Sequence, residues 1–388
     1  MRLSITFFIR SFFLLAILIN TPACSKDPYL ESMAICEAPS SKAQKKLLHS
    51  LAEQVDMNYF ADSCEPLLKR LMTTDNQINI DFDTPDITIL HGLTGIKTLL
   101  ISENLALRDL DMFENFTRLS QLTLHANKNL EDISGISEMT SLKYLSIVDS
   151  NVSNIKPLKN LIHLTTLILP RNNIKNISAL GNLTEIKTLN LSKNYFSDIS
   201  PLTRLQKLES LYLRDNTRIK NISLLGEIKT LKKLDFYQVP GLKENAHFFS
   251  KLVNLQELDA TYGDIDDIRF VKTLKKLTRL KLSHNKITDI SPVQQLKNIE
   301  YLNLEHNNIT DISVLRNVHT LKTLHISGNK ITDFSPVSSL AMLKKVSFLS
   351  NPVRNCDLLK DTICKSCIYE CNEAISYYDT MRKNSNIE

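Results

Sequence analysis

One phrase occurs twice in residues 283–315, which read "SHNKITDISPVQQLKNIEYLNLEHNNITDISVL". The first copy starts at Asn285 and the second at Asn307, 22 residues later, and both follow the pattern N-x-I-T-D-I-S. Between them lies an apolar–x–apolar step, Leu302–Leu304, in which two apolar residues flank one polar residue. Internal repeats of this length are typical of solenoids, in which each repeat forms one coil that stacks on the next.

The same step recurs through most of the chain. Thirteen copies run from Ile78–Ile80 to Val346–Phe348, spaced 21 to 24 residues apart. An Asn stands three residues after most of them, at Asn104, Asn127, Asn172, Asn194, Asn216, Asn285, Asn307, Asn329 and Asn351. Other residues interrupt this series at Asp83, Ser150, Val239 and Gly263. A period sustained over so many copies predicts one repeat domain, which we place at residues 77–355.

The repeat pattern has a direct physical interpretation. The two apolar residues of a step point to the same side of a short strand, because side chains alternate along a strand. The Asn amide can pair backbone groups that the following turn leaves unsatisfied. One coil cannot bury its own apolar side chains, whereas stacked coils share one core and one parallel sheet. The sequence therefore predicts an α/β solenoid with the sheet on its concave face and short 3₁₀ or extended segments on its convex face.

The consensus L-x-x-L-x-L-x-x-N-x-I-x-D-I-x-P-L-x-x-L resembles the short leucine-rich repeat of bacterial internalin-type surface proteins. The resemblance extends from Ile78 to Val353. It implies a leucine-rich repeat horseshoe that binds a protein ligand, often a host receptor in that family, on its concave sheet. Because this chain ends in "RKNSNIE", where internalins carry a cell-wall sorting signal, we expect a protein ligand without assigning it to a host.

The first 23 residues are predicted to be a signal peptide. Arg2 and Arg10 supply positive charge, the apolar run of "SFFLLAILIN" is too short to span a bilayer, and the small residues of "TPAC" follow. "TPAC" resembles a bacterial lipobox, which implies a lipidated Cys24 that anchors the mature chain. Ser25 resembles a signal for the outer membrane of a Gram-negative cell. Cleavage and secretion without lipid is the alternative, and in either case we expect residues 24–35 to form a tether.

Six further cysteines flank the repeats. They are Cys36 and Cys64 before the repeats, and Cys356, Cys364, Cys367 and Cys371 after them. Because an exported chain enters an oxidising compartment, we predict one disulfide at the front and two at the back. A zinc site at the C-x-x-C of the last group is the alternative, and the pairing of the last four cysteines stays open.

Both ends of a solenoid need a cover, because an open end exposes the core. Before the repeats, apolar residues recur at helical spacing, at Leu47, Leu48, Leu51, Val55, Leu67, Leu68 and Leu71. We therefore predict a helical N-terminal cap at residues 36–76, tied by Cys36 and Cys64. A Cys-rich helical C-terminal cap is predicted at residues 356–388.

Candidate ligand-binding residues stand between or beside the inward-facing pairs, where the concave face would display them. They are Tyr144, Tyr212, Arg214, Asp235, Tyr237, Asp259, Tyr262, Lys281, Tyr301 and Glu305. Tyr and Arg are favoured anchors at protein interfaces. Since Tyr212, Tyr237 and Tyr262 fall in three consecutive repeats, we expect one contiguous patch with a step of about 5 Å per strand. The alternative is an envelope scaffold whose solvated side chains form no discrete ligand site.

Several other classes of function find no support in the sequence. The net charge of +5, from 47 basic and 42 acidic residues, gives no reason to expect nucleic acid, or membrane contact beyond a lipid on Cys24. We find no phosphate-binding loop and no nucleophile elbow, and predict neither an enzyme nor a cofactor. His284, His306 and His325 lie in consecutive repeats and would suit zinc. We interpret them instead as exposed turn and strand residues and predict no metal site.

Overall fold

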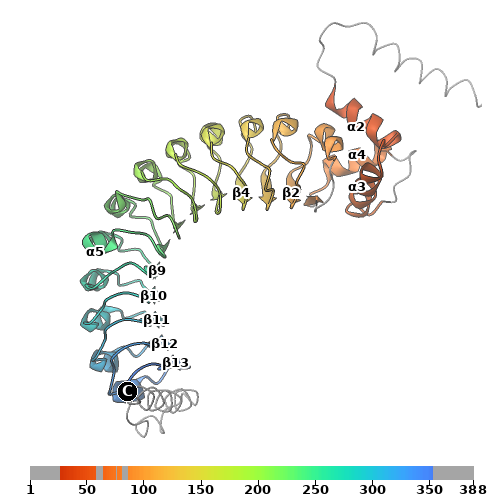
Figure 1. The fold of residues 1–388 in the computed structure, drawn as a ribbon. Coiled ribbons are helices and arrows are strands. Elements are labelled where there is room, and N and C mark those ends of the chain that lie inside the picture. Colours follow the sequence, from red (N-terminus) through yellow and green to blue (C-terminus); the bar gives the residue numbers. More distant parts are fainter. Residues whose placement is uncertain (1–26, 58–63, 76, 81–85, 353–388) are drawn as a thin grey trace, which may run out of the picture.

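The computed structural model describes residues 27–57, 64–75, 77–80 and 86–352. They form a curved solenoid whose strands line the inner side of an arc, with short helices on the outer side and larger helices at the N-terminal end (Figure 1). This is the leucine-rich repeat horseshoe that the sequence predicts. In these ranges, none of the helices is long and apolar enough to cross a membrane.

One parallel sheet of 13 strands follows the order of the chain. The strands are β1 (Ile78–Ile80), β2 (Thr98–Ser102), β3 (Gln121–His125), β4 (Tyr144–Val148), β5 (Thr166–Ile168), β6 (Thr188–Asn190), β7 (Ser210–Tyr212), β8 (Lys233–Asp235), β9 (Glu257–Asp259), β10 (Arg279–Lys281), β11 (Tyr301–Asn303), β12 (Thr323–His325) and β13 (Lys345–Ser347). Equivalent positions pair across neighbouring strands, so that Leu302 lies between Leu280 and Leu324. The predicted steps are therefore confirmed in place and in register.

Short 3₁₀ helices return the chain along the convex side, as the sequence predicts. They are η2 (Thr88–Gly92), η3 (Asp111–Phe113), η4 (Ser134–Ile136), η5 (Lys156–Asn160), η6 (Ser178–Asn182), η7 (Ser200–Arg204), η8 (Ile222–Glu227), η9 (Ala246–Lys251), η10 (Arg269–Thr273), η11 (Ser291–Gln295), η12 (Ser313–Asn317) and η13 (Ser335–Ser339). In η11, Val293 is buried and Gln294 is exposed. Each coil thus contributes apolar residues to the core from both its strand and its 3₁₀ turn.

The longest interval between steps contains an extra short helix, α5 (Leu242–Asn245). It leads into η9, where Phe248 and Phe249 are fully buried. Both rings pack against Phe236, with centroid distances of 6.2 Å. The pairing of β8 with β9 continues in register. The insertion therefore lies on the convex side and adds aromatic volume to the core without breaking the sheet.

Buried Asn side chains form a ladder where the strands end. Asn307 Nδ2 donates to the carbonyl oxygens of Leu282 and Leu304 at 3.0 and 2.9 Å. Its Oδ1 accepts from the N–H of Ile287 at 3.0 Å. Nδ2 atoms make the same bond to the preceding coil at Asn127, Asn172, Asn194, Asn216, Asn285, Asn329 and Asn351. Except at Asn127, each of these Asn side chains also donates to a carbonyl of its own coil and thus satisfies backbone groups of two coils at once.

Replacing Asn307 with alanine is expected to lower the free energy of unfolding by about 1–3 kcal/mol, because buried carbonyl and N–H groups lose their partners. Urea titration followed by circular dichroism measures the change. Asn298→Ala is a matched control, since the exposed Asn298 makes a single bond, to the carbonyl of Lys275. Equal losses in the two variants would contradict a special role for the ladder.

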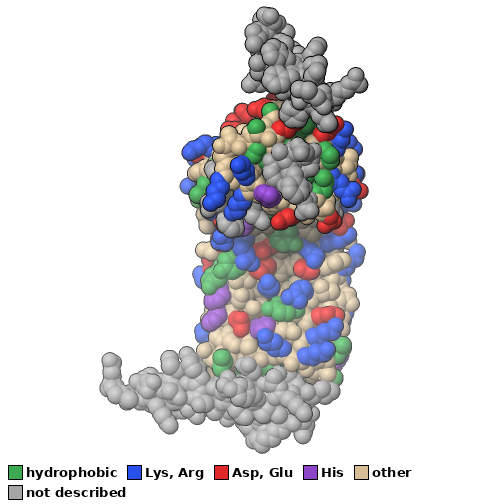
Figure 2. Space-filling model, turned by 90° about the vertical axis from the view of Figure 1, so that its right-hand side faces the viewer, with side chains coloured by type: hydrophobic (Ala, Val, Ile, Leu, Met, Phe, Trp, Pro, Cys, Tyr) green, Lys and Arg blue, Asp and Glu red, His purple; other side chains and the backbone are tan. Residues whose placement is uncertain are grey.

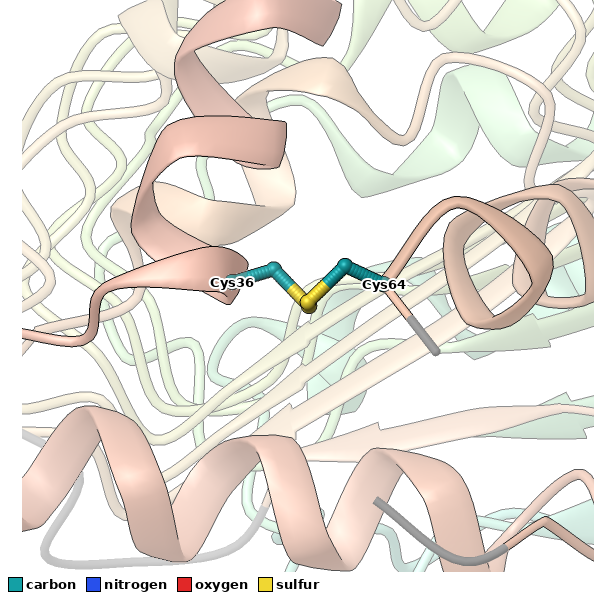
Figure 3. The surroundings of a disulfide bond; sticks show 2 residues. All are labelled: Cys36 and Cys64. Atoms are coloured by element: carbon teal, nitrogen blue, oxygen red, sulfur yellow. A yellow bond between two sulfur atoms is a disulfide. The ribbon is translucent and has the colours of Figure 1, made fainter. Parts of the chain in front are cut away.

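Three helices close the N-terminal end: α2 (Pro28–Glu37), α3 (Lys42–Glu53) and α4 (Cys64–Thr73). Their buried apolar residues, Leu47, Leu48, Leu51, Leu67, Leu68 and Leu71 among them, extend the core of the repeats. The predicted disulfide between Cys36 and Cys64 is present and joins the end of α2 to the start of α4 (Figure 3). The helical N-terminal cap is therefore confirmed.

The helix α2 corrects the expectation of a tether at residues 24–35. It begins at Pro28, with the Asp27 side chain accepting a hydrogen bond from the N–H of Tyr29. Proline suits the first turn of a helix and Asp is a favoured N-cap. The buried Ser32 hydroxyl then donates to the carbonyl of Ile89 and accepts from the N–H of Gly92. These contacts hold residues 28–35 against the first repeat.

Candidate functional site

The inner face of the arc displays the residues that stand between the buried pairs. Basic, acidic and apolar side chains are interspersed on this face, and His side chains lie both at one edge and nearer its middle (Figure 2). Strands β2 to β7 contain no Asp, Glu, Lys or Arg. By contrast, β8, β9 and β10 each contain two charged residues. Counted by strand residues alone, the concave face therefore has an uncharged part, β2 to β7, and a charged part, β8 to β10, although Arg171, Lys193 and Asp215, which follow β5 to β7, also line this face.

Two carboxylates mark the centre of the charged part. Asp235 and Asp259 are partners in register on β8 and β9. Arg214 Nη2 lies 3.4 Å from Asp235 Oδ2 and 3.8 Å from Asp259 Oδ2. Lys281 Nζ lies 3.3 Å from the same Asp259 oxygen. The two acids thus share two cations across four consecutive repeats.

Burial raises the pKa of Asp235, and the neighbouring charge of Asp259 adds to this effect. The N–H of Tyr237, which donates to Asp235 Oδ1 at 3.1 Å, opposes it, as do the charges of Arg214 and Lys281. Burial without full compensation makes the ionised carboxylate costly to hold. Arg214, Lys281 and the Tyr237 N–H therefore offset only part of the cost of the charge on Asp235.

Aromatic contacts extend the charged cluster. The Arg214 guanidinium lies over the Tyr237 ring, 4.4 Å from its centroid. The Tyr237 ring meets the Tyr262 ring edge to face, with centroids 5.4 Å apart. A groove of about 700 Å³ opens beside them, and Tyr212, Arg214, Asp235 and Tyr237 contribute to its walls. A second groove, of about 210 Å³, adjoins it, because both are lined by Tyr212 and Asp235.

The structure brings six of the predicted residues into one contact network, which we name the central cluster. It consists of Arg214, Asp235, Tyr237, Asp259, Tyr262 and Lys281. Tyr301 and Glu305 lie farther along the sheet, where both approach His325, and the Arg279 guanidinium stacks on Tyr301 at 4.3 Å. Tyr144 opens β4 in the uncharged part, away from both groups.

The expected patch of three stepping tyrosines needs a correction. Tyr237 and Tyr262 are in contact, but Tyr212 pairs in register with Asp235 and lines the groove beside them. The three residues occupy different positions in their repeats, so they run diagonally across the sheet and do not form one column. Tyr212 therefore contributes to the groove wall, while Tyr237 and Tyr262 form the aromatic contact.

The three histidines do not converge on a common point. The rings of His284 and His306 stack face to face, with centroids 4.3 Å apart. His325 instead contacts Tyr301 and Glu305. Within the part of the chain that the structure describes, no group of three His, Cys, Asp or Glu side chains is arranged to hold a metal ion.

Reasoning from the sequence missed two features of the site, although the sequence contains a pattern that indicates each of them. The ring of Tyr262 stacks on His284, with centroids 4.2 Å apart, so the aromatic contacts continue into the next repeats. Tyr262, His284 and His306 share one offset from their steps, which could have identified a column. The absence of charge from β2 to β7 was also visible, but only a strand-by-strand count reveals it.

Cys24, Cys356, Cys364, Cys367 and Cys371 lie outside the described residues.

Comparisons with known proteins agree with the fold. Family models described as leucine-rich repeats match residues 162–204 and 275–317, in two-copy form, and residues 319–333, as a single repeat. Among solved structures, an internalin, InlF from Listeria monocytogenes, matches with a TM-score of 0.71 and 23% identity, covering 83% of this chain and 93% of that chain. The functional domain of InlJ, from the same organism, gives a TM-score of 0.57 and 18% identity, with 82% and 71% covered.

A plant structure with the same type of repeat also matches. The peptide hormone receptor RGFR1, solved in complex with RGF2, gives a TM-score of 0.52 and 20% identity, covering 74% of this chain and 57% of that chain. No curated protein sequence matches the chain significantly. The repeats and the sheet together define the leucine-rich repeat fold. Within that class, the chain is internalin-like in fold.

Proposed function

We propose that this chain is an exported protein that binds another protein through its concave face. The observation that carries the proposal is the central cluster, in which Arg214, Tyr237 and Tyr262 are held by mutual contacts in the turns that follow β7, β8 and β9. Tyr and Arg that are already positioned lose little freedom on binding and act as anchors. The uncharged strands β2 to β7 beside them suit the core of an interface, which is depleted in charge.

The chemistry of the face favours a protein over other ligands. A polyanion requires a basic stripe. Here the cations Arg214 and Lys281 are paired with acidic neighbours. The two grooves are shallow depressions of an open sheet, which suits a broad partner. RGFR1, which shares the fold, was solved with the peptide hormone RGF2 bound, and this adds support for a polypeptide ligand.

The proposed location is the cell envelope. The signal-like segment at residues 1–23 and the "TPAC" sequence support export, with Cys24 lipidated and the chain held at the outer membrane, or released by cleavage. The disulfide of Cys36 with Cys64 is consistent with an oxidising compartment. We propose no catalytic activity and no cofactor, in keeping with the binding role that leucine-rich repeat folds typically have.

Tyr237→Ala and Tyr262→Ala are each expected to weaken partner binding by about 2 kcal/mol, or about 30-fold, because truncating an anchor removes a large contact area. A cross-linking pull-down with the mature chain identifies the partner, and calorimetry then measures the affinity of each variant. The controls are Gln294→Ala and Arg316→Ala, which lie exposed in η11 and η12 on the convex side.

If both Tyr variants keep the affinity of the unmodified chain and the two control variants bind more weakly, the binding face lies on the convex side. A mature chain that captures no partner, with or without the Tyr changes, would favour the second candidate, an envelope scaffold without a discrete ligand site. Circular dichroism of each variant ensures that a loss of binding is not a loss of folding.

A further inference from the structure

A column of stacked rings follows one edge of the sheet. Tyr262, His284 and His306 come from three consecutive repeats, and their ring centroids are 4.2 and 4.3 Å apart. The planes are inclined by only 9° and 17°. Figure 2 shows His side chains along this edge of the concave face. We name these three residues the ring column.

The backbone explains why the rings stack. Tyr262, His284 and His306 have φ values of 59°, 54° and 53°, so each stands at the same left-handed turn after its strand. Equivalent side chains then repeat at about the spacing of the strands, about 4.8 Å. The column ends at Gly328, which holds the next equivalent position. A Cβ atom there would lie 2.5 Å from His306 Nδ1, so Gly leaves the space that the His306 ring fills.

The other end of the ring column reaches the central cluster. The Tyr262 ring packs against Tyr237, and Tyr237 carries the guanidinium of Arg214. Arg214 in turn bridges Asp235 and Asp259. A continuous series of side-chain contacts therefore connects His306 to the middle of the concave face. A change in the position of the rings would be transmitted to the Tyr and Arg anchors.

Protonation changes the forces inside the ring column. Burial lowers the pKa of His284, the neighbouring His306 lowers it further, and Glu305 opposes both. From the preceding repeat, the ring of Tyr262 faces the His284 ring. One imidazolium can remain stacked on the Tyr ring through a cation–π contact. Two imidazolium rings at a centroid distance of 4.3 Å repel each other. Glu305 is the acidic group that opposes the effect of His306 on His284.

We propose that the ring column is a proton-operated element of the concave binding site. With neutral histidines, the stack holds Tyr262 against Tyr237. When both His284 and His306 carry protons, the rings separate and Tyr262 is released, which alters the surface that Tyr237 and Arg214 present. The regulatory role rests on the proposed binding function, whereas the opening itself is a property of the chain alone.

Nuclear magnetic resonance of the full chain, labelled with ¹³C in its His and Tyr rings, tests the opening without any ligand. The Tyr262 and Tyr237 ring signals are expected to shift between about pH 8 and about pH 5, with the same midpoint as the second of the two histidine protonations. In His306→Gln, His284 is expected to take up its proton at a higher pH than in the unmodified chain. The step that coincides with a second histidine protonation is expected to disappear from the Tyr262 and Tyr237 titrations.

His319→Gln is the matched control, since the exposed His319 lies outside the column; its Tyr262 titration is expected to equal that of the unmodified chain. Tyr262 and Tyr237 signals that stay unchanged while both histidines titrate would overturn the proposal. So would a His284 titration that is identical with and without His306. Either result would leave the binding proposal intact, because the Tyr237→Ala and Tyr262→Ala affinities test that separately.

Discussion

Phe249→Ala is expected to lower the free energy of unfolding by about 3–5 kcal/mol, the usual cost of truncating a buried Phe. Phe249 is fully buried, and its ring lies between those of Phe248 and Phe270, with centroid distances of 4.3 and 5.0 Å. It also contacts Phe236 at the end of β8. The cavity would therefore open between Phe236 and Phe248 of the same coil and Phe270 of the next coil. Urea titration followed by circular dichroism measures the loss.

Val253→Ala is the control for this change. Val253 follows η9 and is 49% exposed, so its truncation should alter the free energy of unfolding by about 0.5 kcal/mol or less. A small effect of Phe249→Ala, similar to that of the control, would mean that the irregular repeat unfolds before the rest of the solenoid and contributes little to its stability.

Removal of both Cys36 and Cys64, by substitution with alanine, is expected to destabilise the folded protein by about 3–4 kcal/mol. The two residues are separated by 28 positions, and closing a loop of that length restricts the unfolded chain by about this free energy. The disulfide also joins α2 to α4, and these helices cover the first coil. Loss of the cover exposes the end of the core, from which a solenoid frays.

Urea titration measures this loss in the free energy of unfolding. The double variant and the unmodified chain are compared under non-reducing conditions. The variant is preferable to a reducing agent, because a reductant would also break the two disulfides that we predict after the repeats. Identical unfolding midpoints would show that the apolar contacts of Leu47, Leu51 and Leu68 hold the cap without help from the disulfide.

The regular part of the fold was predictable because the 22-residue period determines the strands, their buried side and their register. A step such as Leu302–Leu304 gives both the strand and the side that it buries, and its repetition gives the register with β10 and β12. Asn307 bonds the backbone as its amide chemistry suggests. The N-terminal disulfide followed from the number of cysteines and from the predicted export. Helix α2 was missed, because its apolar residues show no helical pattern and Ser32 makes its key contacts with a distant segment.

The site was less predictable, for a geometric reason. Alternation along a strand places Tyr212 and Asp235 correctly on the inner face. It fails two residues after the step, where the backbone turns with positive φ and sends Tyr262 and His284 to the edge of the sheet. Sequence spacing also cannot reveal that Arg214 reaches over Tyr237, because that contact depends on rotamers. The C-terminal cap and the lipid on Cys24 stay predictions, since they lie outside the described residues.

The Asn ladder allows the solenoid to be lengthened by whole coils. Asn307 bonds only its own coil and the one before it, through Leu304 and Leu282, and the same pair of bonds recurs in the coils on either side. Duplication of one 22-residue segment within the gene would therefore insert a coil whose bonds already fit both neighbours. Each duplication would lengthen the inner face by one strand, about 4.8 Å. The reach of the binding surface can thus change in discrete increments during evolution, while every existing coil keeps its structure.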